Sequence, residues 1–348
     1  MSSIVWERFA RVTHQPHVHA WLIMQGNLGL ARNTLIAYAA ALDDYLDITA
    51  KIPHDPVTAT RETIAHYVHD LATRPNPRLA NRPGMVAHAG LANATMQQRL
   101  TAIRLFYDYL MEQGLRTDNP VGRGRFTPGK AFGGQRDRGL IPRYHTLPWI
   151  PSEDQWAAIL TVVRTESLRT RVMFALTYEA ALRREEVCHI ATGDLDPAHR
   201  LLRIRAETTK NRQERVVPYS AATGTLYMHY LQQRRQLSAA RGSLFLSESR
   251  RNYAQPISIW TWSKTIAAIA ARADIAQFTT HTLRHLRLTD LARADWELHA
   301  IARFAGHRSL SSALHYIHLS GRDLAAKLER SMTAVHAQRV ARLAEVLT

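Results

Sequence analysis

The sequence predicts a mainly α-helical protein with one small antiparallel β-sheet. Apolar residues recur at helical spacing along most of the chain, whereas residues 201–205 and 214–218 have the character of two short strands joined by a polar turn. The chain has 348 residues, of which 46% are hydrophobic, so it is long enough to bury more than one core. We therefore expect two main domains.

Three helices are predicted in an N-terminal domain of residues 1–120. Residues 33–46, 61–71 and 95–111 each place apolar side chains three or four residues apart. Gly114 ends the third helix, and Asn119-Pro120 prevents it from starting again. Prolines and a glycine between the second and third helices predict a long loop there.

Basic residues exceed acidic ones along the whole chain. Lys and Arg number 45 against 29 Asp and Glu, which gives a formal net charge of +16. A solubilising surface or a ribosome-associated protein could carry this charge, but nucleic acid is the partner it favours. The single cysteine, Cys188, excludes an internal disulfide framework. With no signal-peptide pattern and no apolar run of ~18 residues, we expect a cytoplasmic protein that does not interact with a membrane.

Residues 121–150 are predicted to form a basic linker. Glycines and prolines alternate there with basic residues that include Arg123, Arg125 and Lys130. The segment is either a flexible spacer with incidental charge or a strap that lies on the phosphates of a duplex. We favour the second interpretation.

The second domain is expected to begin at residue 151 and to end near 320. Ser152 is a candidate helix N-cap, with Gln155 three residues later as its capping-box partner. Helices are predicted through Ile159 and again over 170–189, before the two strands. Helical patterning resumes near Thr223. Residues 321–348 are predicted to form an amphipathic helix that packs on its own chain or docks on a neighbouring protomer.

Four segments of this domain carry residue types suited to phosphate chemistry. The first is YEAALRREEV at 178–187, which contains Arg183, and the second is the polar turn with Lys210. The third is HTLRH at 281–285, and the fourth is Gly306-His307, followed nine residues after the histidine by Tyr316. Each segment alone would fit an ordinary role, such as a surface arginine or a packed tyrosine. Their joint occurrence, in this order, is specific.

These motifs resemble the tyrosine recombinase family, also called the phage integrase family. Its pattern is an arginine in a G-L-R-x-x-E-like helix, a lysine in a β-turn, H-x-x-R-H, then G-H and a tyrosine nine residues further on. The resemblance covers residues 152–320, and residues 33–38 and 99–106 look like parts of the family's helical (SAM-like) core-binding domain. It implies two domains that form a C-shaped clamp round DNA. Ala181 stands where the family usually has glycine, and we expect it to require only a little more room.

The resemblance implies that Tyr316 is a nucleophile that becomes bonded to a DNA 3′-phosphate. Arg183 and Arg284 are expected to clamp the non-bridging oxygens of that phosphate, because guanidinium groups bind oxyanions in bidentate geometry and stay charged at any working pH. The bond energy is conserved in the phosphotyrosine. No metal and no other cofactor is expected.

The remaining motif residues are expected to move protons or to support the clamp. Lys210 is expected to protonate the leaving 5′-oxygen. His281 and His307 are expected to donate to the phosphate or to help move the phenol proton, because imidazole titrates near neutrality. Glu186 is expected to orient or neutralise a neighbouring basic group, and His285 to act as a support residue.

The expected partner is double-stranded DNA with paired inverted half-sites, on which four protomers form a synapse, with directionality or bending proteins as possible accessories. The element served is expected to be mobile, such as a phage, transposon or integron. The alternatives are a type IB-like topoisomerase and a DNA-binding protein that uses the same fold without cleavage. The candidates for contact with DNA are Arg32, Gln97, Gln98, Arg104, Arg123, Arg125, Lys130 and Arg212.

Overall fold

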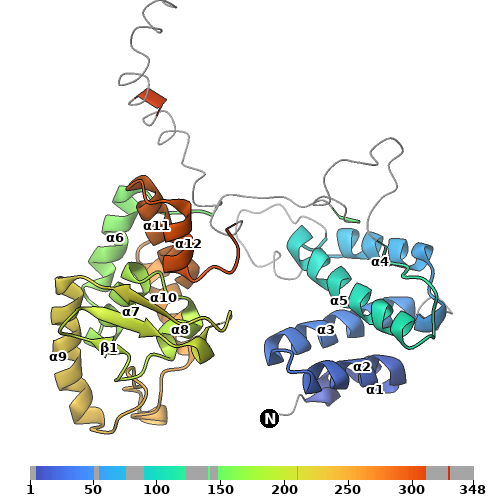
Figure 1. Ribbon diagram of the computed structural model, residues 1–348, viewed down its shortest axis with the longest axis horizontal. Helices are drawn as coiled ribbons and strands as arrows, with labels where there is room; N and C mark the ends of the chain where they lie inside the picture. Colours follow the sequence, from blue (N-terminus) through green and yellow to red (C-terminus); the bar gives the residue numbers. More distant parts are fainter. Residues whose placement is uncertain are drawn as a thin grey trace, which may run out of the picture. The chain divides into compact units, whose positions relative to one another are not determined.

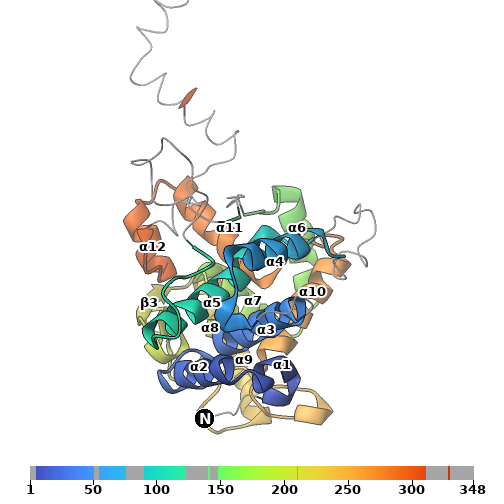
Figure 2. The same ribbon diagram turned by 90° about the vertical axis from the view of Figure 1, so that its right-hand side faces the viewer.

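The computed structural model describes residues 5–50, 55–75, 90–122, 140–141, 148–209, 211–310 and 328–329. The chain divides into two compact units, Met1–His145 and Thr146–Thr348. Figures 1 and 2 show the helices of each unit and the small sheet of the second. Within these ranges no helix has the length and apolarity needed to cross a lipid bilayer.

The first unit is a bundle of helices. Its α-helices are α1 (Ala10–His14), α2 (Pro16–Asn27), α3 (Arg32–Thr49), α4 (Arg61–Thr73) and α5 (Asn93–Glu112), and single 3-10 turns occupy Trp6–Arg8 and Pro56–Thr58. The three predicted helices are confirmed as α3, α4 and α5. Helices α1 and α2 were not predicted. Pro16 at the start of α2 and the buried Val18, Trp21 and Leu22 were the signals for the second of these.

Aromatic side chains fill the core of the first unit. The phenol groups of Tyr45 and Tyr107 lie 2.7 Å apart, and Tyr107 donates to the Pro56 carbonyl at 3.0 Å. Trp21 packs against Phe106 with ring centroids 6.0 Å apart. These contacts join α2, α3 and α5, so the α3–α5 pair is held from within by large buried rings.

The second unit is mainly helical and contains one three-stranded sheet. Its helices are α6 (Glu153–Val163), α7 (Leu168–Glu179), α8 (Arg184–Cys188), α9 (Ala221–Leu237), α10 (Ile259–Arg272), α11 (Thr280–Arg293) and α12 (Leu298–Ala305). The strands β1 (Leu195–Asp196), β2 (Leu201–Ile204) and β3 (Arg215–Pro218) pair antiparallel in that order, and 3-10 turns occupy Ala206–Thr208 and Arg250–Asn252. The mainly helical fold with a small antiparallel sheet is confirmed.

The predicted helix over 170–189 is wrong as one element, because the chain leaves the helix after Glu179 and starts α8 at Arg184. Ala181 has a left-handed backbone with φ +47°. Its N–H donates to the Tyr178 carbonyl at 3.1 Å, and the Leu182 N–H donates to Thr177 at 3.0 Å, which is the hydrogen-bond pattern of a Schellman helix end. A glycine at position 181 would adopt this left-handed conformation without strain. The expectation that Ala181 requires only a little more room was therefore incomplete.

The capping box at the start of the second unit is confirmed. The Ser152 hydroxyl accepts from the Gln155 N–H at 3.3 Å, and the Gln155 side chain accepts from the Ser152 N–H at 3.0 Å. The predicted strands are confirmed as β2 and β3, while the two-residue β1 was missed. The predicted linker, apart from residues 121–122, 140–141 and 148–150, and the C-terminal helix, apart from residues 328–329, lie outside the described residues.

Candidate active site

Arg183 stands at the N-terminus of α8, directly after the left-handed turn. Its Nη1 donates to Glu186 Oε1 at 2.7 Å, and its backbone N–H donates to Glu186 Oε2 at 2.9 Å. Nη2 donates to the Gly306 carbonyl at 3.3 Å. The side chain is 18% exposed, so the guanidinium is fixed by the protein and still reaches solvent.

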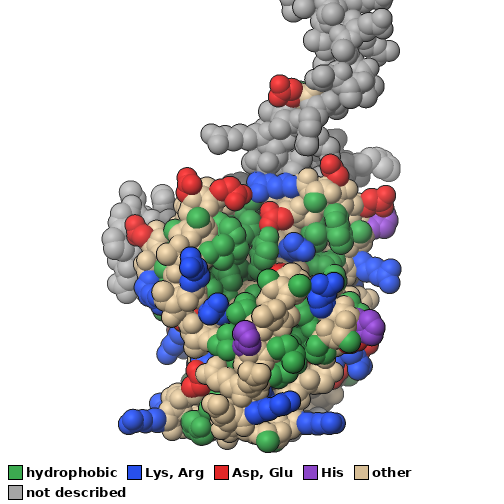
Figure 3. Space-filling view, turned by 90° about the vertical axis from the view of Figure 1, so that its left-hand side faces the viewer, with side chains coloured by type: hydrophobic (Ala, Val, Ile, Leu, Met, Phe, Trp, Pro, Cys, Tyr) green, Lys and Arg blue, Asp and Glu red, His purple; other side chains and the backbone are tan. Residues whose placement is uncertain are grey.

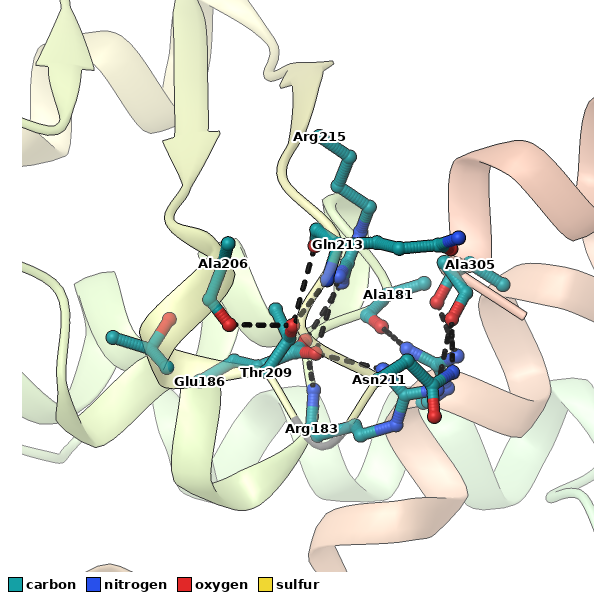
Figure 4. A network of polar contacts seen from close by, with 12 residues as sticks. Ala181, Arg183, Glu186, Ala206, Thr209, Asn211, Gln213, Arg215 and Ala305 are labelled. Atoms are coloured by element: carbon teal, nitrogen blue, oxygen red, sulfur yellow. Dashed lines mark hydrogen bonds and ion pairs between the residues drawn. The ribbon is translucent and has the colours of Figure 1, made fainter. Parts of the chain in front are cut away.

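Glu186 is the anchor of this arrangement and is 2% exposed. Besides Arg183, it accepts from two nitrogens of Arg215 on β3, at 3.1 and 2.7 Å (Figure 4). Burial alone would raise the pKa of the Glu186 carboxyl, but hydrogen bonds and charge from Arg215, together with Arg183, lower it to about 2. Glu186 is therefore ionised at any working pH.

Arg284 lies on α11 and is 4% exposed. Its Nη1 donates to the carbonyl of Ala181, and its Nη2 donates to the carbonyl of Ala305 at 2.6 Å. The left-handed turn at Ala181 aims one acceptor at this guanidinium, and the end of α12 supplies the other. Two helix ends thus hold Arg284 in place.

The end of α12 links the two arginines. Gly306 terminates the helix with φ +61°, and its carbonyl accepts from Arg183 Nη2 and from the Asn211 side chain at 2.9 Å. The Ala305 carbonyl, one residue earlier, accepts from Arg284. Because consecutive carbonyls receive one guanidinium each, Arg183 and Arg284 are brought to the same place from distant parts of the chain.

Two histidines adjoin this cluster. Burial, followed by the charges of Arg284, Arg183 and Arg215, lowers the pKa of His307 to about 3, so the imidazole is neutral at pH 7. The pKa of His281 is lowered too, first by desolvation and then by the nearby arginines, against an opposing effect of Glu185. A neutral imidazole can donate a hydrogen bond to an oxyanion, while the positive charges beside it make it a weaker proton acceptor.

His285 and the β2–β3 turn lie near the histidines and the arginine cluster. The ring centroids of His281 and His285 lie 6.3 Å apart. In the turn, the Thr209 hydroxyl donates to the carbonyls of Ala206 and Gln213 at 3.0 and 3.2 Å. Lys210 lies in this turn but outside the described residues, as does the predicted nucleophile, Tyr316.

The described residues therefore bring together Arg183, Glu186 and Arg284, with His307 following directly on the shared Gly306. Arg215 and Asn211 also belong to this cluster and were not predicted. Arg215 had a signal, because it shares one face of β3 with Val217, which is 1% exposed. An arginine on the buried face of a strand needs an acidic partner.

The predicted DNA contacts on the first unit lie on α3 and α5. Arg32 and Gln98 are exposed, and Gln97 and Arg104 are half-buried. Gln98 lines a shallow pocket between these helices together with Asn33, Thr34, Ala37, Tyr38 and Thr101. On the second unit Arg212 is exposed in the Lys210 turn, with φ +53°. Arg123, Arg125 and Lys130 lie outside the described residues.

Figure 3 shows one face of the molecule, on which Lys and Arg side chains lie in separate places between apolar and acidic side chains. The surplus of positive charge is thus not gathered into a single patch on that face. The cluster of Arg183, Arg215 and Arg284 differs from these surface charges because it is largely internal. Arg215 and Arg284 are 9% and 4% exposed.

A profile described as "Phage integrase family" matches residues 151–322, which include every motif residue from Arg183 to Tyr316. The chain belongs to the phage integrase family. It is accordingly a tyrosine recombinase, an enzyme of the class that breaks and rejoins DNA.

Comparison with known proteins agrees with this assignment. The chain is 28% identical over 305 residues to tyrosine recombinase XerD of Caulobacter vibrioides, which covers 85% of this chain and 88% of the relative. A crystal structure of a lambda integrase dimer bound to a COC′ core site has a TM-score of 0.63 at 15% identity, over 88% of this chain and 96% of that one. XerH bound to a palindromic difH substrate, in a post-cleavage complex, has a TM-score of 0.64 at 16% identity, over 93% of each chain. The two structures share the fold of this family member.

Proposed function

We propose that this phage integrase family member recombines specific DNA sites through a covalent bond between Tyr316 and a DNA 3′-phosphate. The observation that carries the proposal is the anchoring of Arg183 and Arg284 on the consecutive carbonyls of Gly306 and Ala305. Two fixed guanidiniums at one place suit a phosphodiester, whose transition state gathers negative charge on its non-bridging oxygens.

The proposed reaction forms one bond and breaks one. The Tyr316 phenol oxygen attacks the scissile phosphorus, the bond to the 5′-oxygen breaks, and Lys210 supplies the proton that makes the 5′-hydroxyl. The phenol proton passes to an imidazole, for which His307 and His281 are the candidates. A phosphate bound between the arginines would offset the positive charges that lower the pKa of both histidines. Attack by the 5′-hydroxyl of another strand on the phosphotyrosine reverses the step and reseals the DNA.

The proposed substrate is a duplex with two inverted half-sites, bound by two protomers, and four protomers form the synapse. The two units close round the duplex as a C-shaped clamp, with residues 1–120 as the core-binding domain, 121–150 as the linker strap and 151–320 as the catalytic domain. The proposed role is the integration, excision or transposition of a mobile element in the bacterial cytoplasm, at the nucleoid. Residues 321–348 dock on the same or a neighbouring protomer.

We further propose that α3 and α5 contact the bases and backbone of each half-site. Support comes from the exposed polar and basic side chains of Arg32, Asn33 and Gln98 on these helices. Contacts to phosphate make binding depend steeply on salt, because each neutralised phosphate releases counterions. Base contacts by the glutamines would give the sequence preference.

The test of the function is trapping on a nicked suicide substrate. After cleavage, the short fragment that carries the new 5′-hydroxyl dissociates, so the strand cannot be religated. Wild-type protein should form an SDS-resistant adduct that retains a label on the 3′-phosphate side of the break, and Tyr316→Phe should form none. An adduct with Tyr316→Phe equal to that of wild type, or no adduct with wild type on its own target, would contradict the proposal. Relaxation of a supercoiled plasmid that lacks the target site would favour a type IB-like topoisomerase instead.

A further inference from the structure

Arg215 joins the β2–β3 hairpin to the arginine cluster, although it belongs to none of the sequence motifs. It is 9% exposed and lies on β3, which follows the turn that contains Lys210. Its Nη1 and Nη2 donate to the two carboxylate oxygens of Glu186 at 3.1 and 2.7 Å (Figure 4). This is a bidentate ion pair in a site that excludes most water.

The Glu186 carboxylate is shared between Arg215 and Arg183. Oε1 accepts from a guanidinium nitrogen of each arginine, and Oε2 accepts from Arg215 Nη2 and from the Arg183 backbone N–H. A buried carboxylate that is paired with a single guanidinium would cancel the positive charge of that guanidinium. Since two guanidiniums share this carboxylate, one positive charge is left over for an anion.

Arg215 also packs directly against Gly306. A Cβ atom at position 306 would lie 2.9 Å from Arg215 Nη1 and 3.3 Å from its Cδ. The Gly306 carbonyl is the acceptor that holds Arg183 Nη2. Arg215 therefore touches both of the groups that orient Arg183, the Glu186 carboxylate and the Gly306 backbone.

We propose that Arg215 is a positioning residue of the recombination reaction, which offsets the charge of Glu186 so that Arg183 presents its own charge to the scissile phosphate. The contact with Gly306 keeps the Arg183 guanidinium turned toward that phosphate. The inference rests on the proposed function, because it requires Arg183 to bind a phosphate. Arg215 itself does not touch the DNA.

The first test compares Arg215→Met with the double variant Arg215→Met/Glu186→Gln. In the single variant Glu186 remains and neutralises Arg183, so adduct formation on preloaded suicide substrate should slow by ~10- to 100-fold, as when an orienting partner is lost. DNA affinity should change little. In the double variant the opposing carboxylate is gone, and about tenfold or more of the rate should return. A double variant that is as slow as the single one, or slower, would overturn the charge-offset role.

The second test uses a substrate with a methylphosphonate at the scissile position, which lacks one negative charge there. If Arg215 acts through the charge of Arg183, Arg215→Met should slow cleavage of the methylphosphonate much less than cleavage of the phosphodiester. A loss that arises only from disturbed folding would slow both substrates equally. Equal slowing would therefore count against the proposal.

The matched control is Arg203→Met on the neighbouring strand β2. Arg203 forms an ion pair with Glu214 at 2.8 Å, but its side chain is 56% exposed and it does not approach Glu186 in any described contact. The Arg203→Met protein should cleave both substrates at the wild-type rate. If Arg215→Met does not fold, Arg215→Lys takes its place. That variant keeps the charge, so its slowing should not depend on which of the two substrates is used, and preferential slowing on the phosphodiester would contradict the proposal.

The outcomes separate this inference from the function on which it rests. If wild type forms no adduct dependent on Tyr316, the proposed function fails. If wild type forms the adduct and Arg215→Met forms it at the same rate, only the role of Arg215 fails.

Discussion

Two carboxylates, Asp44 in the first unit and Glu186 in the second, are each held by two arginines, yet their surroundings differ in net charge. Asp44 accepts from Arg74 at 2.7 and 3.0 Å and pairs with Arg99. Arg74 also pairs with Asp70 at 2.6 Å. Two arginines thus face two carboxylates, and the local charge is balanced. The network joins α3, α4 and α5 and serves the fold.

Around Glu186 the balance is different. Arg183 and Arg215 share this carboxylate, and Arg284 is held by backbone carbonyls nearby. Among the described residues, these three arginines face the one carboxylate of Glu186, beside a His307 whose pKa is lowered to about 3. The comparison teaches that paired charges alone do not mark a site. An excess of arginines over carboxylates, held by buried acceptors, is what we expect of an anion-binding centre.

The strongest way to break the comparison is Arg284→Ala. Loss of one guanidinium that stabilises the transition state should lower the rate of adduct formation by ~10²- to 10³-fold or more. DNA binding should largely survive, because phosphate contacts elsewhere supply most of the affinity. Binding is measured by fluorescence anisotropy and cleavage on the suicide substrate, with thermal unfolding as the check on folding. Parallel loss of binding and cleavage would show that Arg284 is only structural.

Asp44→Asn tests the other side of the comparison. Replacing the shared carboxylate should lower the free energy of unfolding by about 1–3 kcal/mol, because Arg99 loses its charged partner and Arg74 loses one of two. Cleavage by protein already bound to DNA should be unchanged. The control is Asp47→Asn, whose ion pair with Arg11 is more exposed and should contribute little. A cleavage defect in fully folded Asp44→Asn would mean that this network also serves the reaction.

Gly306→Ala and Gly114→Ala form a matched pair at two helix ends. Both glycines have left-handed backbones, with φ +61° and +70°, but only Gly306 has protein atoms within 4 Å of the added Cβ. Gly114→Ala should cost about 1 kcal/mol of stability from backbone strain alone. Gly306→Ala should cost more and also slow cleavage, because Arg215 must move. Equal effects of the two substitutions in urea unfolding and in cleavage would refute the importance of that contact.

Ala181→Gly should have the smallest effect, and a favourable one. With φ +47° the alanine is strained, so glycine should raise the free energy of unfolding by about 0.5–1 kcal/mol. The Ala181 carbonyl that holds Arg284 should stay in place, and cleavage should not change. Ala180→Gly, one residue earlier with φ −93°, is the control and should destabilise the protein. Destabilisation by both substitutions would show that the turn is not strained.

The sequence predicted those parts of the molecule that depend on local periodicity and on motif spacing. The helices α3, α4 and α5 have regular apolar spacing, and the Ser152 capping box uses residues only three apart. The order of Arg183, Arg284 and His307 was sufficient to place them in one family pattern.

The remaining features depend on tertiary contacts. The break after α7 was missed, because alanine is a good helix former and nothing local signals a positive φ at Ala181. Arg215 was passed over because a strand arginine is usually exposed, and its acidic partner lies 29 residues earlier in the chain. The two-residue strand β1 is too short for any alternation to be visible.

The most direct test of the central claim is to identify the residue that carries the DNA. The adduct trapped on suicide substrate is digested with nuclease and protease, and the modified peptide is sequenced by mass spectrometry. We predict a nucleotide 3′-phosphate on Tyr316, with no signal from Arg183→Ala/Arg284→Ala protein that still binds the site. A nucleotide on any other side chain, or DNA cleavage without a covalent peptide, would contradict the account.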